Sequence, residues 1–563
     1  MTGETSPSRR IFWAGGKLWE TCGEAFRAVA SAERLIPAAA APPSPSSRER
    51  VRRNLGREVF RAGVGSLDVF VKRRRSTTLA DRVRRMFRRD RAEHEFRIAK
   101  RLAELGVRTA RPVAFAISRG GEESTLLTQT VEGGRTVYDL VEGAGGRIEP
   151  VRRRRFSERL ADLVATLHNA GVEHPDLHER NILVREARPG VDELYLLDLH
   201  EATLGRRVRP SAAVRDLRRL GRYFSIRTSR TERLRFFLRY ARLRGFAPGD
   251  VPQLARAVER ATLESRADFW RRRDSRPLSK ASGVRRRTRR GTEAFSAVDA
   301  NEAFWAACLE RPEAVLCAAI RARIKQGRRT AVLETDVPEL TGAGSVVVKQ
   351  YRYSWAREAV ARLARDDPGT RAWRGALALA LRDVPAPRPL LLVRRKRWGV
   401  VAASDLVLER IPDAVAISRY LPSAVRGVDA AQRRRIVRGA VDAAASLVRR
   451  LHERGASHRD LKGTNVLAVG TEDPARPSLW LVDLDSVRTW RRVPERERVQ
   501  NLGRLQAEFA DSAWLTRTDR LRFLKAYLGA EAYRTGVWKS LWRTTARWAA
   551  RKAARTRRNK PSR

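Results

Sequence analysis

Two passages of the chain carry the same polar residue types at nearly the same spacing. Leu167–Val184 reads LHNAGVEHPDLHERNILV, and Leu451–Val469 reads LHERGASHRDLKGTNVLAV. In each passage an Asp follows a predicted helix end, an Asn comes five residues later, and a second Asp ends an apolar strand 17 or 18 residues after the Asn. The residues are Asp176, Asn181 and Asp198 in the first copy, and Asp460, Asn465 and Asp483 in the second. A carboxylate can receive the proton of a hydroxyl, and Asn and Asp oxygens are ligands that Mg²⁺ prefers, so the pattern suits phosphoryl transfer.

Phosphoryl transfer also needs a fixed cation for the phosphates. The chain has only 12 lysines, and two of them end equivalent β-branched segments: DVFVK ends at Lys72 and SVVVK ends at Lys349. We therefore predict that each copy binds phosphate through this lysine.

Histidines gather in the same passages, which hold five of the seven in the chain. For His174 and His458 we expect an architectural role, with ring hydrogen bonds that brace the loop. A metal site made by His174 and His178 is disfavoured, because the second copy has Lys462 where the first has His178.

The similarity extends beyond these passages and indicates two copies of one domain. Four equivalent positions are separated by 284 residues, and LRFFLRY (Leu234–Tyr240) is matched by LRFLKAY (Leu521–Tyr527). Linker composition and a run rich in Arg and Lys then suggest the boundaries. The predicted organisation is a 1–47 N-terminal extension and linker, a 48–270 first domain, a 271–299 basic connector, a 300–545 second domain and a 546–563 basic tail.

Each copy shows the same order of elements. A strand ending in Lys is followed by a helix, a Pro-marked extended segment, and a second helix that ends in L-H-x-x-G. The expected helices are Arg91–Leu105 and Phe156–Ala170 in the first copy, and Thr370–Arg382 and Gln432–Arg454 in the second. The fold class that follows is α+β: two tandem bilobal domains, each with a small antiparallel sheet lobe and a mainly helical lobe.

Length and composition limit the class of protein. The chain has 563 residues and a formal net charge of +53, so its surface should attract nucleotides, anionic lipid or nucleic acid over about 8 Å at physiological salt. No base-reading nucleic-acid module is visible. Three cysteines cannot form a disulfide framework, and no signal peptide or membrane span is apparent, which predicts a cytoplasmic protein.

The motifs resemble the protein-kinase-like superfamily. HRDLKGTN in the second copy is close to a eukaryotic-type catalytic loop, and HPDLHERNILV in the first resembles the bacterial lipopolysaccharide kinases that phosphorylate Kdo or heptose. The resemblance continues through REVFRAGVGSLDVFVKRRR and RAWRGALALALRDVPAPRPL, and it implies ATP and Mg²⁺ as cofactors. In the first copy, the resemblance implies that Lys72 binds phosphate with Glu95 as its helix partner, that Asp176 is the base, and that Asn181 and Asp198 bind magnesium. In the second copy, it implies the same roles of phosphate binding, base and magnesium binding for Lys349, Asp460, and Asn465 with Asp483. Lys462 in the second copy, or His178 in the first, would steady the transferring phosphate.

The second copy departs from this pattern at the helix partner. Alignment places Ala372 or Trp373 where Glu95 falls, so Lys349 is expected to lack its ion-pair partner, and both reduced activity and a pseudokinase remain open. Neither copy has G-x-G-x-x-G. The short segment after each second Asp favours a small hydroxyl-bearing acceptor such as a core sugar. A Ser/Thr protein kinase and a non-catalytic scaffold are the alternatives.

The C-terminal tail is basic, with Arg543, Arg547, Arg551 and Arg555 recurring every four residues. One interpretation is an interfacial helix that contacts an anionic membrane surface, peripheral to the inner face of the inner membrane, with its tryptophans at the head groups. The other is a solvated helix whose tryptophans pack on the second domain.

Overall fold

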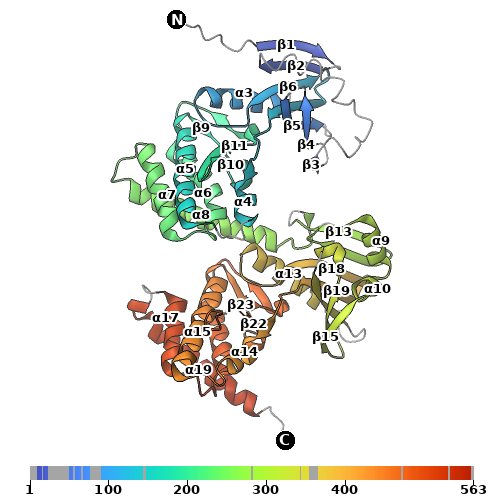
Figure 1. Ribbon diagram of the computed structural model, residues 1–563, viewed down its shortest axis with the longest axis vertical. Helices are drawn as coiled ribbons and strands as arrows, with labels where there is room; N and C mark the ends of the chain where they lie inside the picture. Colours follow the sequence, from blue (N-terminus) through green and yellow to red (C-terminus); the bar gives the residue numbers. More distant parts are fainter. Residues whose placement is uncertain are drawn as a thin grey trace. The chain divides into compact units, whose positions relative to one another are not determined.

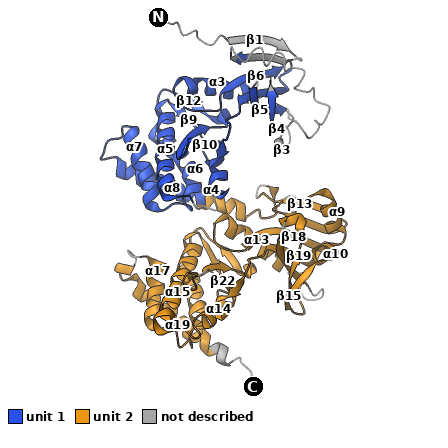
Figure 2. Ribbon diagram, in the orientation of Figure 1, with its two compact units in different colours: residues 1–266 blue, residues 267–563 orange. Residues whose placement is uncertain are grey.

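In the computed structural model the chain divides into two compact units, residues 1–266 and 267–563 (Figures 1 and 2). The structure describes residues 9–558 except 15–16, 23–49, 55–56, 65–66, 76–89, 144–147, 281–282, 299, 343, 354–365, 471–472 and 530–532.

The first unit has a sheet lobe followed by a helical lobe. Its elements are β1 (Arg9–Ala14), β2 (Lys17–Cys22), β3 (Arg50–Asn54), β4 (Arg57–Val64), β5 (Leu67–Arg75), α3 (Arg91–Glu104), β6 (Pro112–Ser118), β7 (Glu123–Gln129), β8 (Arg135–Thr136), α4 (Val137–Gly143), α5 (Pro150–Asn169), β9 (Val172–Glu173), β10 (Ile182–Arg188), β11 (Val191–Leu196), β12 (Thr203–Leu204), α6 (Pro210–Phe224), α7 (Arg230–Leu243) and α8 (Val251–Asp274). The large sheet is antiparallel, in the order β1-β2-β6-β7-β5-β4-β3.

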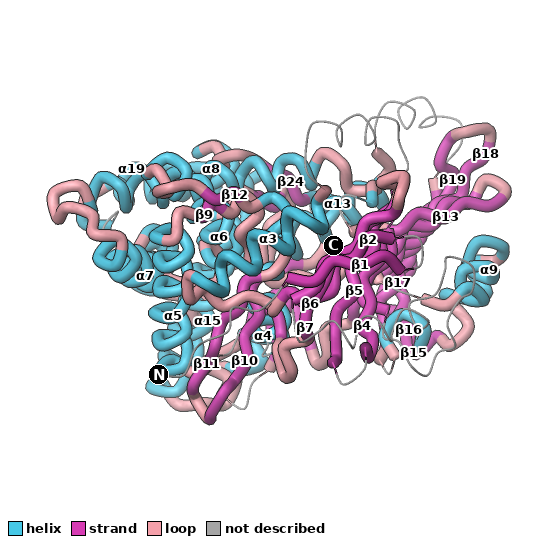
Figure 3. Tube along the Cα trace, turned by 90° about the horizontal axis from the view of Figure 1, so that it is seen from above, coloured by secondary structure: helices cyan, strands magenta, loops and turns pink. Residues whose placement is uncertain are grey.

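Alternation along β5 explains how this sheet presents its lysine. Val69 and Val71 are fully buried, and the next residue, Lys72, lies on the opposite face of the strand. Figure 3 shows the strands β4, β5, β6 and β7 gathered together, with α5 and α7 apart from them. The helical lobe has its own core, to which α5 contributes Phe156, Leu160 and Val164.

The second unit repeats this plan. Its elements are β13 (Arg285–Arg289), β14 (Thr292–Ser296), α9 (Glu302–Glu310), α10 (Pro312–Leu316), β15 (Ile320–Gln326), β16 (Thr330–Asp336), α11 (Pro338–Thr341), β17 (Ser345–Arg352), α13 (Pro368–Leu381), β18 (Pro389–Arg397), β19 (Val400–Glu409), β20 (Ala414–Ala416), α14 (Ile417–Ala424), α15 (Ala430–Glu453), β21 (Ala456–His458), β22 (Val466–Val469), β23 (Ser478–Leu481), β24 (Val487–Thr489), α16 (Glu495–Glu508), α17 (Arg517–Leu528) and α19 (Val537–Arg558). Its sheet order, β13-β14-β18-β19-β17-β16-β15, is strand for strand that of the first. The α+β fold and the duplication are confirmed.

The helix ends follow the sequence signals. Asp90 and Asp367 are equivalent N-caps, each accepting a backbone N–H of the first turn of α3 or α13. Gly171 and Gly455 follow α5 and α15 with φ of 78° and 69°, a left-handed backbone that favours glycine.

The two sheets extend beyond the boundaries predicted for the two domains. Within residues 1–47, β1 and β2 belong to the first sheet, where Thr21 pairs with Ala114, while the linker at 38–47 lies outside the described residues. Within residues 271–299, α8 continues to Asp274, and β13 and β14 form the edge of the second sheet. The run of Arg and Lys without apolar periodicity predicts a connector, but strand pairing uses backbone groups and an edge strand tolerates charged side chains.

At the predicted tail boundary, 545/546, α19 runs through without a break. Thr545 and Ala549 are buried, and Trp542 and Trp548 pack against the core of the second unit, which favours the second interpretation of the tryptophans. Gly503 on α16 permits this approach, since a Cβ there would lie 2.4 Å from the Trp548 ring. Exposed on α19 are Arg543, Arg547 and Arg551, and the side chain of Arg555 lies outside the described residues.

Among the described helices, none combines the length and the hydropathy needed to cross a bilayer.

Candidate active site

In the first unit, Lys72 is held by a carboxylate from α3. Its Nζ lies 2.5 Å from Glu95 Oε1, and the two side chains are 20% and 9% exposed. Glu95 faces inward because it shares the buried face of α3 with Ala92 and Phe96. The predicted ion pair between Lys72 and Glu95 is therefore present.

Asp198 lies next to this pair and turns the chain sharply. Its φ of 57° and ψ of 56° are left-handed, an uncommon conformation for a residue with a Cβ. Its Oδ1 accepts from Arg57 Nη2 at 3.1 Å and from His200 Nδ1 at 2.8 Å, and lies 3.7 Å from Lys72 Nζ. Burial raises the pKa of Asp198, but the hydrogen bond from His200 and the charges of Lys72 and Arg57 outweigh it, and the pKa falls well below its usual range.

Asp176 and Asn181 form a separate hydrogen-bonded pair in the loop after β9. Asn181 Nδ2 donates to the Asp176 main-chain oxygen at 3.0 Å and to its Oδ2 at 3.3 Å. Arg219 of α6 donates to Asp176 Oδ1, and His178 Nε2 lies 3.5 Å from Oδ2. Because the Arg180 N–H donates to His178 Nδ1, the ring proton lies on Nε2, facing Asp176.

These neighbours keep Asp176 ionised. Partial burial raises its pKa, but the hydrogen bond with His178 and the positive charge of Arg219 outweigh the burial and lower the pKa to about 2. At neutral pH the carboxylate can therefore accept a hydrogen bond from a substrate hydroxyl.

Buried groups join the two parts of the site. Leu197 N–H donates to the Asn181 carbonyl at 2.9 Å, which places the Asp198 turn directly beside Asn181. His174 Nε2 lies 3.3 Å from the Leu197 carbonyl, and its backbone N–H donates to the buried Asp216 of α6 at 2.7 Å. His174 is fully buried, and this burial lowers its pKa, so it braces the loop as a neutral ring.

The donor set fits a divalent cation and nucleotide phosphates. Because the Asn181 Nδ2 is committed to Asp176, its amide oxygen is available as a hard ligand next to the Asp198 carboxylate. Glu95, Asp198 and His200 also offer ligand atoms that lie within 4.8 Å of one another. Asn181 and Asp198 would hold Mg²⁺, and Lys72 would hold phosphate.

The second unit assembles the equivalent loop. Asn465 Nδ2 donates to the Asp460 main-chain oxygen at 2.9 Å and to its Oδ2 at 3.1 Å. Lys462 Nζ lies 2.8 Å from Asp460 Oδ2, a hydrogen bond that raises the pKa of Lys462. Burial raises the pKa of Asp460, but its interactions with Lys462 outweigh this and lower it. His458 braces the loop through the Val482 carbonyl at 3.0 Å.

The lysine site of the second unit differs. Lys349 Nζ lies 3.1 Å from Asp483 Oδ1, so Lys349 forms its ion pair with this carboxylate. Counting from the equivalent N-caps Asp90 and Asp367, the position of Glu95 falls on Ala372, which is buried. Nearby on α13, the helix approaches the turn after Asp483 closely, since a Cβ on Gly375 would lie 2.1 Å from the Leu484 carbonyl oxygen.

Sequence reasoning did not single out Arg57 and Arg219. Arg57 contacts Asp198, which lies 141 residues later in the chain, and Arg219 contacts Asp176, which lies 43 residues earlier. In a chain with 117 Lys and Arg, neither carries a local signal that distinguishes it.

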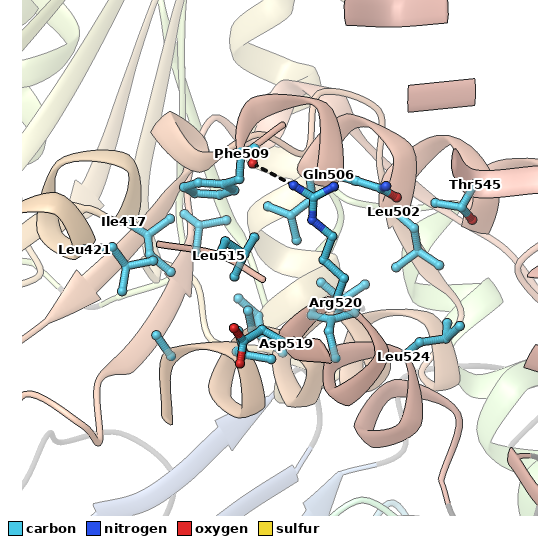
Figure 4. A pocket seen from close by; sticks show the side chains of 18 of the residues that line it. Ile417, Leu421, Leu502, Gln506, Phe509, Leu515, Asp519, Arg520, Leu524 and Thr545 are labelled. Carbon is cyan, nitrogen blue, oxygen red and sulfur yellow. Dashed lines mark hydrogen bonds between the residues drawn. The ribbon is translucent and has the colours of Figure 1, made fainter. Parts of the chain in front are cut away.

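An apolar cavity of about 120 Å³ lies elsewhere in the second unit, between α14, α15, α16, α17 and α19 (Figure 4). Its lining includes Leu421, Leu502, Phe509 and Leu524, and Arg520 Nη2 donates to the Phe509 carbonyl at 3.3 Å. None of the predicted site residues lines it. An apolar wall suits neither phosphate nor a divalent cation, so the cavity is distinct from the predicted site.

Comparisons with known proteins agree with the duplicated motif. The sequence model of the lipopolysaccharide kinase (Kdo/WaaP) family matches residues 45–240 and again residues 345–527. The chain is similar to proteins named 3-deoxy-D-manno-octulosonic acid kinase. The one from Stenotrophomonas maltophilia is 34% identical over 99 residues, 17% of this chain and 36% of the relative. The one from Actinobacillus succinogenes is 29% identical over 107 residues, 18% of this chain and 42% of the relative.

These matches span less than half the length of the relatives. A solved structure titled "WaaP in complex with acyl carrier protein" is 25% identical, with a TM-score of 0.31, and the match covers 38% of this chain and 87% of that chain.

Proposed function

Because the chain belongs to the lipopolysaccharide kinase (Kdo/WaaP) family, we propose that its first unit transfers the γ-phosphoryl group of ATP to a hydroxyl of a lipopolysaccharide core sugar, Kdo or heptose. The observation that carries this proposal is the connected set of Lys72, Glu95 and Asp198 beside the Asp176–Asn181 pair. The names of the curated relatives support the choice of acceptor class.

In this proposal the residues act mainly by position and charge. Lys72, fixed by Glu95, binds the ATP phosphates, and Asp176 orients the acceptor hydroxyl and takes its proton. A carboxylate with a pKa of about 2 is a weak base, so the proton moves late, once the new bond to phosphorus has acidified the hydroxyl. Mg²⁺ held by Asn181 and Asp198 would neutralise charge on the phosphates. Arg219 and His178 hold Asp176 in place.

For the second unit we propose a weaker or non-catalytic nucleotide-binding role. The observation behind this is Ala372 at the position of Glu95, together with Lys349 paired to Asp483. Without the helix carboxylate, the lysine must leave a predicted metal ligand before it can bind phosphate. Because the Asp460–Asn465 pair is intact, the proposal includes low phosphotransferase activity of the second unit.

The test is incubation of the full chain with labelled ATP and three acceptors: a lipopolysaccharide precursor ending in Kdo, one ending in heptose, and casein. The wild type, Asp176→Asn and Asp460→Asn proteins are compared by mass spectrometry of the products. Loss of sugar phosphate in Asp176→Asn alone supports the proposal. Phosphorylation of casein or of the chain itself in place of the sugars would identify a protein kinase, and label in neither class would leave a binding scaffold.

The proposed acceptor is lipid-linked, and the exposed arginines of α19 suit contact with an anionic membrane surface at the inner face of the inner membrane. Arg543, Arg547 and Arg551 are each worth about 1 kcal/mol near such a surface. Flotation with vesicles containing anionic lipid tests this contact, and binding equal to that on neutral vesicles would contradict it.

A further inference from the structure

Arg57 occupies a position from which it can reach the same ligand as Lys72. It is the first residue of β4, which pairs with β5 so that Val59 lies opposite Lys72 and Arg57 lies opposite Arg74. Because side chains alternate along a strand, Arg57, Val59 and Lys72 share one face of the sheet. Arg57 donates to Asp198 Oδ1 at 3.1 Å from there, although its side chain is 42% exposed.

The contact places a cation where a divalent cation would bind. A single oxygen of Asp198 already accepts from Arg57 and from His200, with the Lys72 ammonium 3.7 Å away. A metal ion on Asp198 would repel the guanidinium at this range, so the two cations compete for the carboxylate. A displaced Arg57 would need a new anionic partner.

The nucleotide brings such a partner with the metal. Protein kinases cover the ATP phosphates with the backbone of a G-x-G-x-x-G loop, which this chain lacks. A guanidinium offers two parallel N–H donors that match the oxygens of a phosphate. Arg57 therefore has the chemistry, and from its strand the position, to supply a contact that the missing loop would have made.

Resting on the proposed function, we propose that Arg57 is a ligand for the terminal phosphates of ATP in the first unit, paired with Asp198 in the free protein and transferred to the β- and γ-phosphates when the metal–nucleotide complex binds. When Arg57 moves to the phosphates, its hydrogen bond to Asp198 ends and this carboxylate becomes available to the metal.

The second unit provides an internal comparison. There Val332 lies opposite Lys349, and the position equivalent to Arg57 is Thr330, opposite Tyr351. A threonine carries no charge, so the second unit lacks this cation at the equivalent register.

The first experiment measures nucleotide binding to the full chain by calorimetry, in a Lys349→Ala background that weakens the second site. Arg57→Gln is expected to weaken Mg-ATP binding by about tenfold or more, because a charged hydrogen bond to phosphate is lost. AMP, which lacks the terminal phosphates, should bind Arg57→Gln and the parent protein equally. Thr330→Gln is the matched control and should leave Mg-ATP binding unchanged.

The second experiment titrates Mn²⁺ without nucleotide and follows it by electron paramagnetic resonance. Arg57→Gln should bind Mn²⁺ several-fold more tightly than the parent, because the competing guanidinium is gone. Circular dichroism and the melting temperature should match those of the parent, since the Arg57 side chain is 42% exposed.

The outcomes separate this inference from the proposed function. A parent protein that binds neither Mg-ATP nor Mn²⁺ would overturn both. Mg-ATP binding that is strong in the parent and equally strong in Arg57→Gln would overturn the inference and leave the function standing. Weakened Mg-ATP binding with unchanged Mn²⁺ affinity would overturn the proposal that Arg57 and the metal compete for Asp198.

Discussion

The Lys72–Glu95 ion pair offers the most direct test of how the first unit holds nucleotide. Glu95→Gln removes one charge and keeps the shape of the side chain. The amide still reaches the ammonium, but Lys72 loses the carboxylate that lies 2.5 Å away and is drawn towards Asp198, at 3.7 Å. The variant should then resemble the second unit, where Lys349 pairs with Asp483.

The expected magnitude follows from the burial of the pair. With Glu95 9% and Lys72 20% exposed, solvent screens the charges little, and truncation of one partner in such a pair costs about 2–5 kcal/mol. The Gln amide retains part of the interaction, so we take the lower end. A loss of about 2 kcal/mol corresponds to about a thirtyfold weaker affinity for Mg-ATP.

Calorimetry of Mg-ATP binding in the Lys349→Ala background measures this loss, and phosphotransfer to the best sugar acceptor gives the rate. Glu93→Gln is the matched control, because it removes an ion pair with Arg97 of 2.8 Å on the same helix, α3. The control should bind nucleotide like the parent. Glu95→Gln protein that is folded and binds Mg-ATP within a factor of about two of the parent would refute the role given to the Lys72–Glu95 ion pair.

Asp176→Asn should abolish sugar phosphorylation while Mg-ATP affinity changes little, and a phosphorylation rate that survives in this variant would contradict the assignment. Because the pKa of Asp176 is about 2, the wild-type rate should show no acid limb from this group between about pH 5 and 8. Arg219→Gln should raise the pKa of Asp176, since a cation that stabilises its charged form is gone, and the pH–rate profile should shift accordingly. Burial lowers the pKa of His452 from 6.5 to about 4, so between these pH values the unfolded chain binds more protons than the folded chain. The free energy of unfolding should therefore fall by about 3 kcal/mol as the pH falls through that window. A His452→Gln protein that shows the same acid-induced loss in denaturant titrations would count against this. Gly503→Ala should lower the melting temperature, at a cost of about 1–3 kcal/mol, because its Cβ would meet Trp548 at 2.4 Å; an unchanged melting temperature would mean that α19 is not packed there.

The sequence alone was enough for the features that depend on local pattern. The helix ends at Gly171 and Gly455 follow from a left-handed turn that glycine favours, and the alternation around Lys72 follows from the period of a strand. Equal spacing in the two copies was enough to predict the duplication. The absence of a helix carboxylate in the second copy was also visible, and the N-caps place Ala372 at that position.

Contacts between distant parts of the chain could not be predicted in this way. Arg57 and Arg219 approach Asp198 and Asp176 only because sheet register and helix packing bring them there, and in a chain so rich in arginine no local pattern marks them. The strand β13 could not be predicted for a related reason: its basic side chains are typical of a solvated segment, whereas its structure depends on backbone pairing with β14. Residue types and spacing thus determined which chemistry could be proposed for each copy. The tertiary structure decided which cation faces which carboxylate, because such contacts depend on the relative positions of whole elements.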